Sequence, residues 1–342
     1  MAMSDQLWLR KYRILITDKN DQNALDVSEL HCTFEVHKKR SQGGSYAIVR
    51  IYNLSNDAER LIINDGDRVI IEAGYEGTMG ADRKNDFMKT PGIVSDNEKE
   101  TGEEVASSGQ YGVIFDGQVV YPTRAKETNS DYVLTLSCID GNQPLNFNYI
   151  RKSLNKGMNQ RQIYDEVCRS GSVPITQAHV TDGLSGQALP RGKVFFGRTM
   201  DYVEDICRGN NAVYNFDGGQ LNLYKLTDVA NDEALVVDPY TGLIGMPQQA
   251  TNGLTFRLLL NPAVKLWTKI QIARSEIKEQ TLVVGQKQLP LDDEWIYQAI
   301  EVTHRGDTRG NDWYTDVVGL SRYGAAAFPG ILTDGSTYVN GT

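Results

Sequence analysis

The sequence predicts a mainly β chain that contains one small α+β portion. Apolar residues alternate with polar residues, at the period of a strand, along most of the chain. Glycine is frequent and proline is scarce, at 32 and 10 of 342 residues, which suits a protein with many turns between strands. The helices with the clearest apolar faces are expected between residues 159 and 209. The length allows two or three domains with buried cores.

Residues 1–145 are expected to form a first β-barrel or sandwich domain. Alternation is clearest around Cys32 and Phe34, whose neighbours in sequence are polar. The expected strands are residues 9–17, 30–38, 46–54, 68–74, 112–121 and 132–139, with a short helix from Ser55 to about Ile63.

Residues 75–110 interrupt this domain with a long acidic segment that has almost no apolar pattern. Its acidic residues are Asp82, Asp86, Asp96, Glu98, Glu100, Glu103 and Glu104. A segment of this length inside a compact domain is normally either functional or disordered. An arm that contacts a partner and a merely mobile loop are equally supported.

Residues 146–235 are expected to form a small α+β domain. Its expected elements are a helix capped by Asn159 that runs to about Arg169, a helix capped by Thr199 that ends at Gly209, and a hairpin over residues 212–226 with the turn Asp217-Gly218-Gly219.

Residues 236–320 return to strands and are expected to form a second barrel-like domain, followed by a C-terminal tail of residues 321–342. Within it, Gly242 to Pro247 suggests a tight connection that is poor in hydrogen bonds. The expected strands are residues 254–260, 265–272, 281–284, 295–303 and 313–320, the first two being separated by a corner at Asn261-Pro262.

Composition excludes several classes of protein. The formal net charge of −9 argues against a nucleic-acid reader, which would carry a basic patch. No run of about 18 apolar residues is present, so membrane insertion is not expected. The N-terminal residues lack the apolar stretch of a signal peptide, which predicts a protein made in a cytoplasm. The widely spaced Cys32, Cys138, Cys168 and Cys207 predict buried, reduced thiols.

No pattern for catalysis, cofactor binding or metal binding was found. His31 and His37 are about 20 Å apart in an extended strand, which is too far for one metal ion. His304 with Asp307 and Asp312 could form a cluster, but a glycine-rich turn explains them better. Asp140-Gly141-Asn142 lacks the later carboxylates of a calcium loop. We therefore expect no catalytic residue, no cofactor and no metal site, and the sequence assigns no interface residue.

Several segments form a characteristic series along the chain: Trp8 to Ile14, Ala24 to Val36, Ala47 to Ser55, Ile71 to Gly77, Phe115 to Val119, the paired helices with their Asp-Gly-Gly hairpin, Thr241 to Pro247 and Leu259 to Pro262. In this order they resemble the baseplate hub proteins of phage tails, the class of the T4 hub and of the Mu and P2 late-control tail proteins. The resemblance covers about 320 residues.

This resemblance implies two tail-tube-like β-barrel domains with an intervening α+β domain, and a homotrimer that forms a pseudo-sixfold ring. Such a ring joins the tail tube protein to the central spike protein, contacts other baseplate proteins, and lets DNA pass in transit. The protein would be a non-enzymatic component of the virion tail baseplate, assembled in the host cytoplasm. An acidic chain also fits a channel that must release DNA.

Two other functions stay open from the residues alone. The first is a peptidoglycan-cleaving enzyme of the tail tip, since the chain has 44 acidic residues and a catalytic pair depends on the fold. The second is a carbohydrate- or receptor-binding module of the tail, in which tryptophans would stack on sugars. The candidate tryptophans are Trp8, Trp267, Trp295 and Trp313.

Overall fold

A computed structural model describes most of the 342-residue chain. The described residues are 7–18, 24–40, 43–55, 58, 67–77, 111–128, 131–184, 186, 188–225, 228, 234–250, 253–272 and 296–321. Four predictions fall wholly or largely outside them: the helix of residues 55–63, the acidic segment 75–110, the strand of residues 281–284 and the tail 321–342. Among the described helices, none is long and apolar enough to cross a membrane.

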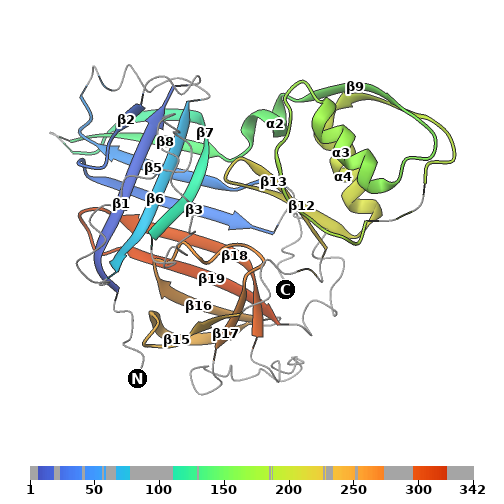
Figure 1. The fold of residues 1–342 in the computed structure, drawn as a ribbon. Helices are drawn as coiled ribbons and strands as arrows, with labels where there is room; N and C mark the ends of the chain where they lie inside the picture. The colour runs from blue at the N-terminus through green and yellow to red at the C-terminus, as the bar shows by residue number, and fades with distance from the viewer. Residues whose placement is uncertain are drawn as a thin grey trace, which may run out of the picture.

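Most strands belong to one thirteen-stranded sheet (Figure 1). Its main path, in the order of hydrogen bonding, is β15 (Leu243–Ala250), β16 (Gly253–Leu259), β19 (Trp313–Ser321), β18 (Ile296–Asp307), β3 (Cys32–Lys39), β5 (Tyr46–Tyr52), β8 (Tyr132–Ile139), β7 (Tyr111–Lys126), β6 (Arg68–Gly77), β1 (Leu7–Thr17) and β2 (Ala24–Asp26). Beside this path, β17 (Lys269–Ile272) pairs with β18, and β14 (Leu235–Val237) pairs with β17.

The two barrel-like regions expected from the sequence share this sheet. Strand β3 from the first region pairs antiparallel with β18 from the second, from Thr33 opposite Asp307 to Lys39 opposite Glu301. The prediction of a mainly β chain is confirmed, but the described strands form no closed barrel. Alternation in sequence specifies which face of a strand is buried, not which strand it pairs with, so the link between β3 and β18 was not foreseen.

The sheet covers two hydrophobic cores. The first core is built from the apolar residues of β1, β3, β5, β6, β7 and β8, such as Ile14, Phe34 and Leu136. Trp313 of β19 also belongs to it, with its ring edge-on to Tyr12 and Phe34 and its Nε1 donating to the Gly74 carbonyl. The second core uses residues between 213 and 317.

The α+β portion lies beside the large sheet and has a core of its own (Figure 1). Its elements are α2 (Asn142–Asn146), β9 (Tyr149–Leu154), α3 (Gln160–Ser170), β10 (Gln177–Val180), β11 (Lys193–Arg198), α4 (Thr199–Gly209), β12 (Ala212–Asp217) and β13 (Gln220–Lys225), with β4 (Gly43–Gly44) added to the edge of β12. The predicted hairpin is confirmed: the turn between β12 and β13 uses the positive φ angles of Gly218 and Gly219.

The two predicted helices are present, with one cap placed differently. Asn159 forms a reciprocal capping box with Gln162 at the start of α3, as a polar residue before an apolar face predicts. At α4 the cap residue is Arg198, which makes no side-chain capping bond, and Thr199 is the first helical residue. The helix ends at Gly209 as predicted, and Asn210 is the C-cap residue.

The stretch of residues 241–272 differs from its prediction in two places, at its start and after Asn261-Pro262. The expected loop at Gly242 to Pro247 is an edge strand, β15, whose pairing is interrupted by a bulge where Gly245 has φ +72°. After Asn261-Pro262 the chain turns until Thr268, and Trp267 has φ +71°, so strand β17 begins only at Lys269. The alternation of apolar and polar residues did not predict the left-handed backbone conformation of Trp267.

Gly44 lies in β4, which pairs with β12 of the α+β portion, and the space around Gly44 leaves no room for a side chain. A Cβ on Gly44 would lie 2.1 Å from the Asp140 carbonyl oxygen. We expect Gly44→Ala to lower the free energy of unfolding by about 1–3 kcal/mol, because backbone atoms must move apart. Urea denaturation followed by circular dichroism measures this. Gly209→Ala is the control, since nothing lies within 4 Å of that Cβ; equal stability of the two variants would contradict the prediction.

Candidate interaction surfaces

A buried ion pair joins the large sheet to the α+β portion. Lys38, at the end of β3, is 3% exposed, and its Nζ lies 2.6 Å from Oδ1 of Asp217 in the β12–β13 turn. Burial pushes the pKa of Asp217 upward, but Lys38, together with Lys265 and His304, acts in the opposite direction and the pKa is lowered overall. The Ser45 hydroxyl donates to the Phe216 carbonyl across the same junction. These contacts connect the two parts of the chain at a specific place.

Asp140, at the end of β8, completes this junction. Its carboxylate accepts a hydrogen bond from the Gly219 amide, and its side chain is buried. Burial and the nearby Asp217 carboxylate raise the pKa of Asp140 to about 7. The junction therefore holds one carboxylate that ionises near neutral pH.

A second buried cation, Arg40, lies just after the end of β3. The Arg40 guanidinium carbon is 4.8 Å from the centre of the Trp267 ring, and its Nη1 donates to Gln298 Oε1 at 3.2 Å. Burial lowers the pKa of Arg40 to about 10. Residues from β3, β18 and the turn before β17 thus meet around one guanidinium.

An exposed apolar face covers the two-stranded sheet of β9 and β11. We call it the β9–β11 face and define it by Phe147 just before β9, by Tyr149 and Arg151 of β9, and by Val194, Phe196 and Arg198 of β11. Arg151 lies opposite Phe196, and Tyr149 lies opposite Arg198. The alternate residues, including Ile150 and Phe195, are buried in the core below.

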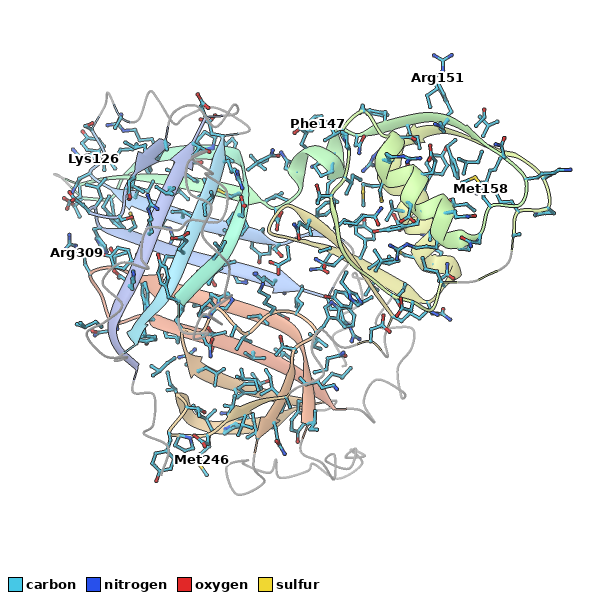
Figure 2. The ribbon with its side chains drawn as sticks, viewed as in Figure 1. Lys126, Phe147, Arg151, Met158, Met246 and Arg309 are labelled. Carbon is cyan, nitrogen blue, oxygen red and sulfur yellow. The ribbon has the colours of Figure 1, made fainter. Side chains whose placement is uncertain are left out.

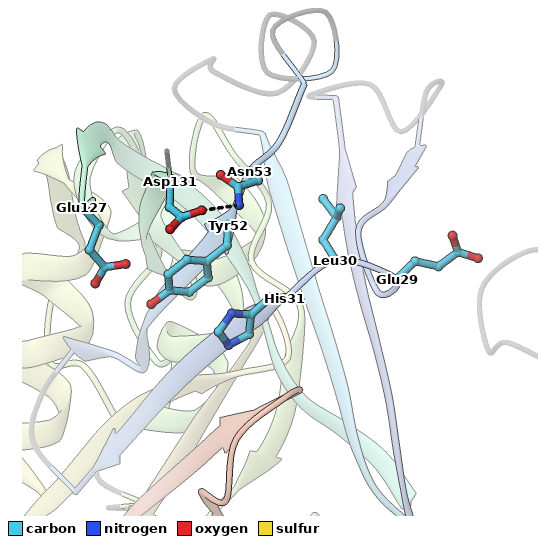
Figure 3. Close-up of a pocket in the computed structure, with 7 residues that line it drawn as sticks. All are labelled: Glu29, Leu30, His31, Tyr52, Asn53, Glu127 and Asp131. Atoms are coloured by element: carbon cyan, nitrogen blue, oxygen red, sulfur yellow. Dashed lines mark hydrogen bonds between the residues drawn. The ribbon is translucent and has the colours of Figure 1, made fainter. Parts of the chain in front are cut away.

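A cavity of about 440 Å³ opens at the far end of the large sheet (Figure 3). It is lined by Glu29, Leu30, His31, Tyr52, Asn53, Glu127 and Asp131. The rings of His31 and Tyr52 are stacked with centroids 4.2 Å apart, and Asn53 Nδ2 donates to Asp131 at 3.1 Å. We call this the acidic pocket, because three of its seven lining residues are carboxylates.

A third exposed patch lies at the edge strand β15 and the turn before it. Tyr240, Ile244 and Met246 are exposed there, and Met246 is labelled in Figure 2. Pro247 and the bulge at Gly245 interrupt the regular row of backbone hydrogen-bonding groups. Such features protect a sheet edge from unintended pairing with other chains.

The residues considered for chemistry are accounted for by structural contacts. His304 is buried, its Nδ1 is 2.9 Å from the Thr315 hydroxyl, and burial lowers its pKa to about 3. The Asp307 carboxylate instead accepts from the amides of Arg309 and Gly310 in the turn, and it lies 2.9 Å from His31 Nε2. His304 and Asp307 therefore do not form a shared site.

The remaining candidates are also structural where they are described. His37 pairs with Glu35 and stacks on Tyr46, away from His31. Asp140-Gly141-Asn142 is the turn into α2. No group of three or more His, Cys, Asp or Glu side chains suited to a metal ion occurs in the described part of the chain.

The cysteines and tryptophans are mostly core residues. The prediction of buried, unbridged thiols is confirmed for the four cysteines, and burial raises the pKa of each to about 12. Trp267 and Trp313 are buried and cannot stack on a sugar. Trp295 and the Trp8 side chain lie outside the described residues.

Sequence reasoning missed the β9–β11 face and the acidic pocket. The β9–β11 face reads in sequence as Phe147, Tyr149, Arg151 and then, forty residues later, Val194 and Phe196. Each half has an alternating pattern, which was a usable strand signal, but only the pairing shows that the apolar residues share one exposed face. The acidic pocket combines three separate chain segments, and no local pattern predicts it.

The arrangement of one large sheet with an α+β portion at its side is the fold of proteins of phage tails. The structure resembles the 43 kDa tail protein of prophage MuSo2 from Shewanella oneidensis, with a TM-score of 0.55 and 10% identity over 92% of this chain and 98% of that chain. It also resembles a tail protein from Neisseria meningitidis MC58, with a TM-score of 0.53 and 8% identity over 91% of this chain and 97% of that chain. No protein-family model and no curated protein matches the sequence. The resemblance to tail proteins expected from the sequence is thus confirmed at the level of the fold.

Proposed function

We propose that this chain is a structural subunit of a phage tail baseplate hub and acts as a homotrimer. The observation that carries the proposal is the fold, which is shared with a prophage tail protein over 98% of that protein's length. In the proposal, residues 1–145 and 236–320 are tube-like domains and residues 146–235 form the intervening α+β domain. Three chains then supply six tube-like units, which make a pseudo-sixfold ring.

The continuous sheet supports this arrangement. Strands β3 and β18 pair over seven residues, which fixes the first tube-like region beside the second within one chain. A ring made of such pairs has the symmetry needed between a sixfold tail tube and a threefold central spike. The ring contacts the tube protein, the spike protein and other baseplate proteins in the virion, and DNA passes through its channel.

The proposed role requires no catalysis. The polar candidates His304, Asp307 and Asp140 each take part in contacts that maintain the fold. No observation on the described residues favours cleavage of peptidoglycan or binding of sugar over the structural role. The hub is therefore the function that we put to the test.

The oligomeric state of the purified full-length chain tests the proposal. We expect mass photometry to show a species of three times the chain mass, and electron-microscopy class averages to show a ring with threefold symmetry and six lobes. Incorporation into tails, seen by mass spectrometry of purified particles, is expected as well. A chain that stays monomeric at micromolar concentration and never enters a tail would overturn the proposal.

A further inference from the structure

A face of paired charges spans the place where the two tube-like regions join. We call it the paired-charge face and define it by three ion pairs between neighbouring strands: Lys39 with Glu301, Arg305 with Glu35, and Arg257 with Asp316. The three N–O distances are 2.9, 2.8 and 2.6 Å. The strands involved, β3, β18, β19 and β16, lie side by side in the large sheet. Their register puts all six side chains on one side of that sheet.

The other side of these strands carries the hydrophobic cores. The residues that alternate with the paired charges are buried there, such as Phe34 and Val36 in the first core and Phe256, Val302 and Val317 in the second. Strands β1 and β6 add a second layer over the first core (Figure 1). The bulk of the chain therefore lies on one side of this part of the sheet.

The shape of a ring decides which side faces the channel. The outer circumference of a closed ring is longer than the inner one, so the bulkier side of each chain lies outside and the bare side lies inside. The paired-charge face is the bare side, because the side chains of Lys39, Arg257 and Arg305 are 41–45% exposed. It also crosses from one tube-like region to the other, as the lining of a ring of adjacent regions must.

The pairing leaves these cations little capacity to bind phosphate. Arg257 donates to Asp316 from both Nε and Nη2, and its guanidinium carbon is 4.0 Å from the centre of the Tyr314 ring. DNA is held by cations that neutralise its phosphates, and a carboxylate already bonded to the cation repels the phosphate. Arg50 of β5 lies on the same side of the sheet and pairs with no carboxylate of the described residues, so each chain leaves this one guanidinium free.

We propose that the paired-charge face lines the channel of the ring, and that DNA passes it without being held because its cations are bound to carboxylates of the neighbouring strands. This inference rests on the proposed trimeric hub and names the part of the chain that the DNA passes. Three chains place nine such pairs around the channel. If these cations were free, they would supply as many phosphate contacts as DNA-binding proteins use, about 6–10.

Cysteine labelling of the full-length trimer tests where the face lies. Thr255→Cys places a thiol at an exposed position of β16, on the same side as Arg257. The four native cysteines are buried, so they add little background. We expect a small maleimide to label this thiol, and a maleimide on a large polyethylene glycol chain to label it about tenfold more slowly or less, because the polymer does not enter the channel. Asp182→Cys, in an exposed turn of the α+β portion, is the control and should react with both reagents.

Removal of the carboxylates tests what the ion pairs do. The triple variant Glu35→Gln, Glu301→Gln and Asp316→Asn keeps the shape of each side chain and frees its cation. Binding of a short fluorescent DNA duplex is measured by anisotropy over a salt series. We expect the triple variant to bind about tenfold more tightly than the wild type at low salt, with an affinity that falls steeply as salt rises. Circular dichroism checks the fold, and the single variant Asp316→Asn, which frees only Arg257, should show a smaller gain and decides the point if the triple variant does not fold.

A matched variant separates position from net charge. Asp165→Asn, Asp201→Asn and Glu204→Gln remove three carboxylates that pair with arginines at the helices α3 and α4. The change in charge equals that of the triple variant, but the freed arginines belong to the α+β portion and not to the paired-charge face. We expect this variant to gain much less affinity for the duplex.

Each outcome decides one point. Exclusion of the polymer from Thr255→Cys, together with a gain in DNA affinity that is specific to the paired-charge face, supports the proposal. Equal labelling of Thr255→Cys and Asp182→Cys by the polymer places the face outside the channel and overturns it, as does a thiol that neither reagent reaches. A triple variant that binds DNA no better than the matched variant or the wild type overturns the role of the ion pairs. These outcomes leave the hub standing, whereas a wild-type chain that forms no trimer overturns the hub function itself.

Discussion

The Lys38→Met variant is expected to lose about 2–3 kcal/mol of unfolding free energy, because it leaves the partly buried Asp217 carboxylate without its cation. Lys38 is 3% exposed and lies 2.6 Å from Asp217, with Asp140 close by. Methionine has a similar length and no charge, so the loss comes from the electrostatics and not from a cavity. Urea denaturation of the full chain at a fixed protein concentration measures the effect.

Two further variants isolate the cause. Lys39→Met removes the neighbouring cation of β3, which forms a more exposed pair with Glu301 at 2.9 Å, and it should cost at most about 1 kcal/mol. The double variant Lys38→Met with Asp217→Asn removes both charges and should recover a large part of the loss. If Lys38→Met and Lys39→Met were equally stable, the buried pair would not be important for the junction.

The Asp140→Asn variant is expected to be more stable than the wild type at pH 8 and similar to it at pH 4. Asp140 has a pKa of about 7 in the folded chain, against a reference value of 3.8. Between these two values the folded state binds more protons than the unfolded state, so the stability of the wild type falls as pH rises from 4 to 7. The shift corresponds to an upper bound of about 4 kcal/mol. Asparagine removes this dependence and keeps the oxygen that accepts from the Gly219 amide.

Unfolding free energies at pH 4, 6 and 8 check this prediction. Asp182→Asn is the matched control, since Asp182 is exposed in a turn, and its pH profile should follow that of the wild type. If the stability of Asp140→Asn changed between pH 4 and 8 in the same way as that of the wild type, other groups would dominate and the Asp140 assignment would be wrong.

Local features of the fold followed well from the sequence. The alternation of Cys32, Phe34 and Val36 correctly gave the buried face of β3. Asn159 correctly gave the start of α3, and the two glycines gave the hairpin turn, because each is specified by its own neighbours. These elements depend on interactions that are close in sequence.

Pairing between distant strands did not follow from the sequence. Nothing near Lys39 indicates that Glu301 will lie opposite it, so two separate barrel-like domains were expected where one continuous sheet is found. The strands β9 and β11 were missed for a related reason. They form a short pair with apolar residues on both faces, and those on one face are buried while those on the other are exposed. The β9–β11 face depends on this pairing and was equally hidden.

The pairing of β3 with β18 also sets the order in which the chain can fold during synthesis. Trp313 belongs to the first core, so that core stays incomplete until the last strand has left the ribosome. Until then, one edge of β3 lacks its partner strand β18. Closing a contact over more than 260 residues is slow, and the waiting chain is prone to aggregate. Chains that stop short of residue 296 should therefore need chaperones.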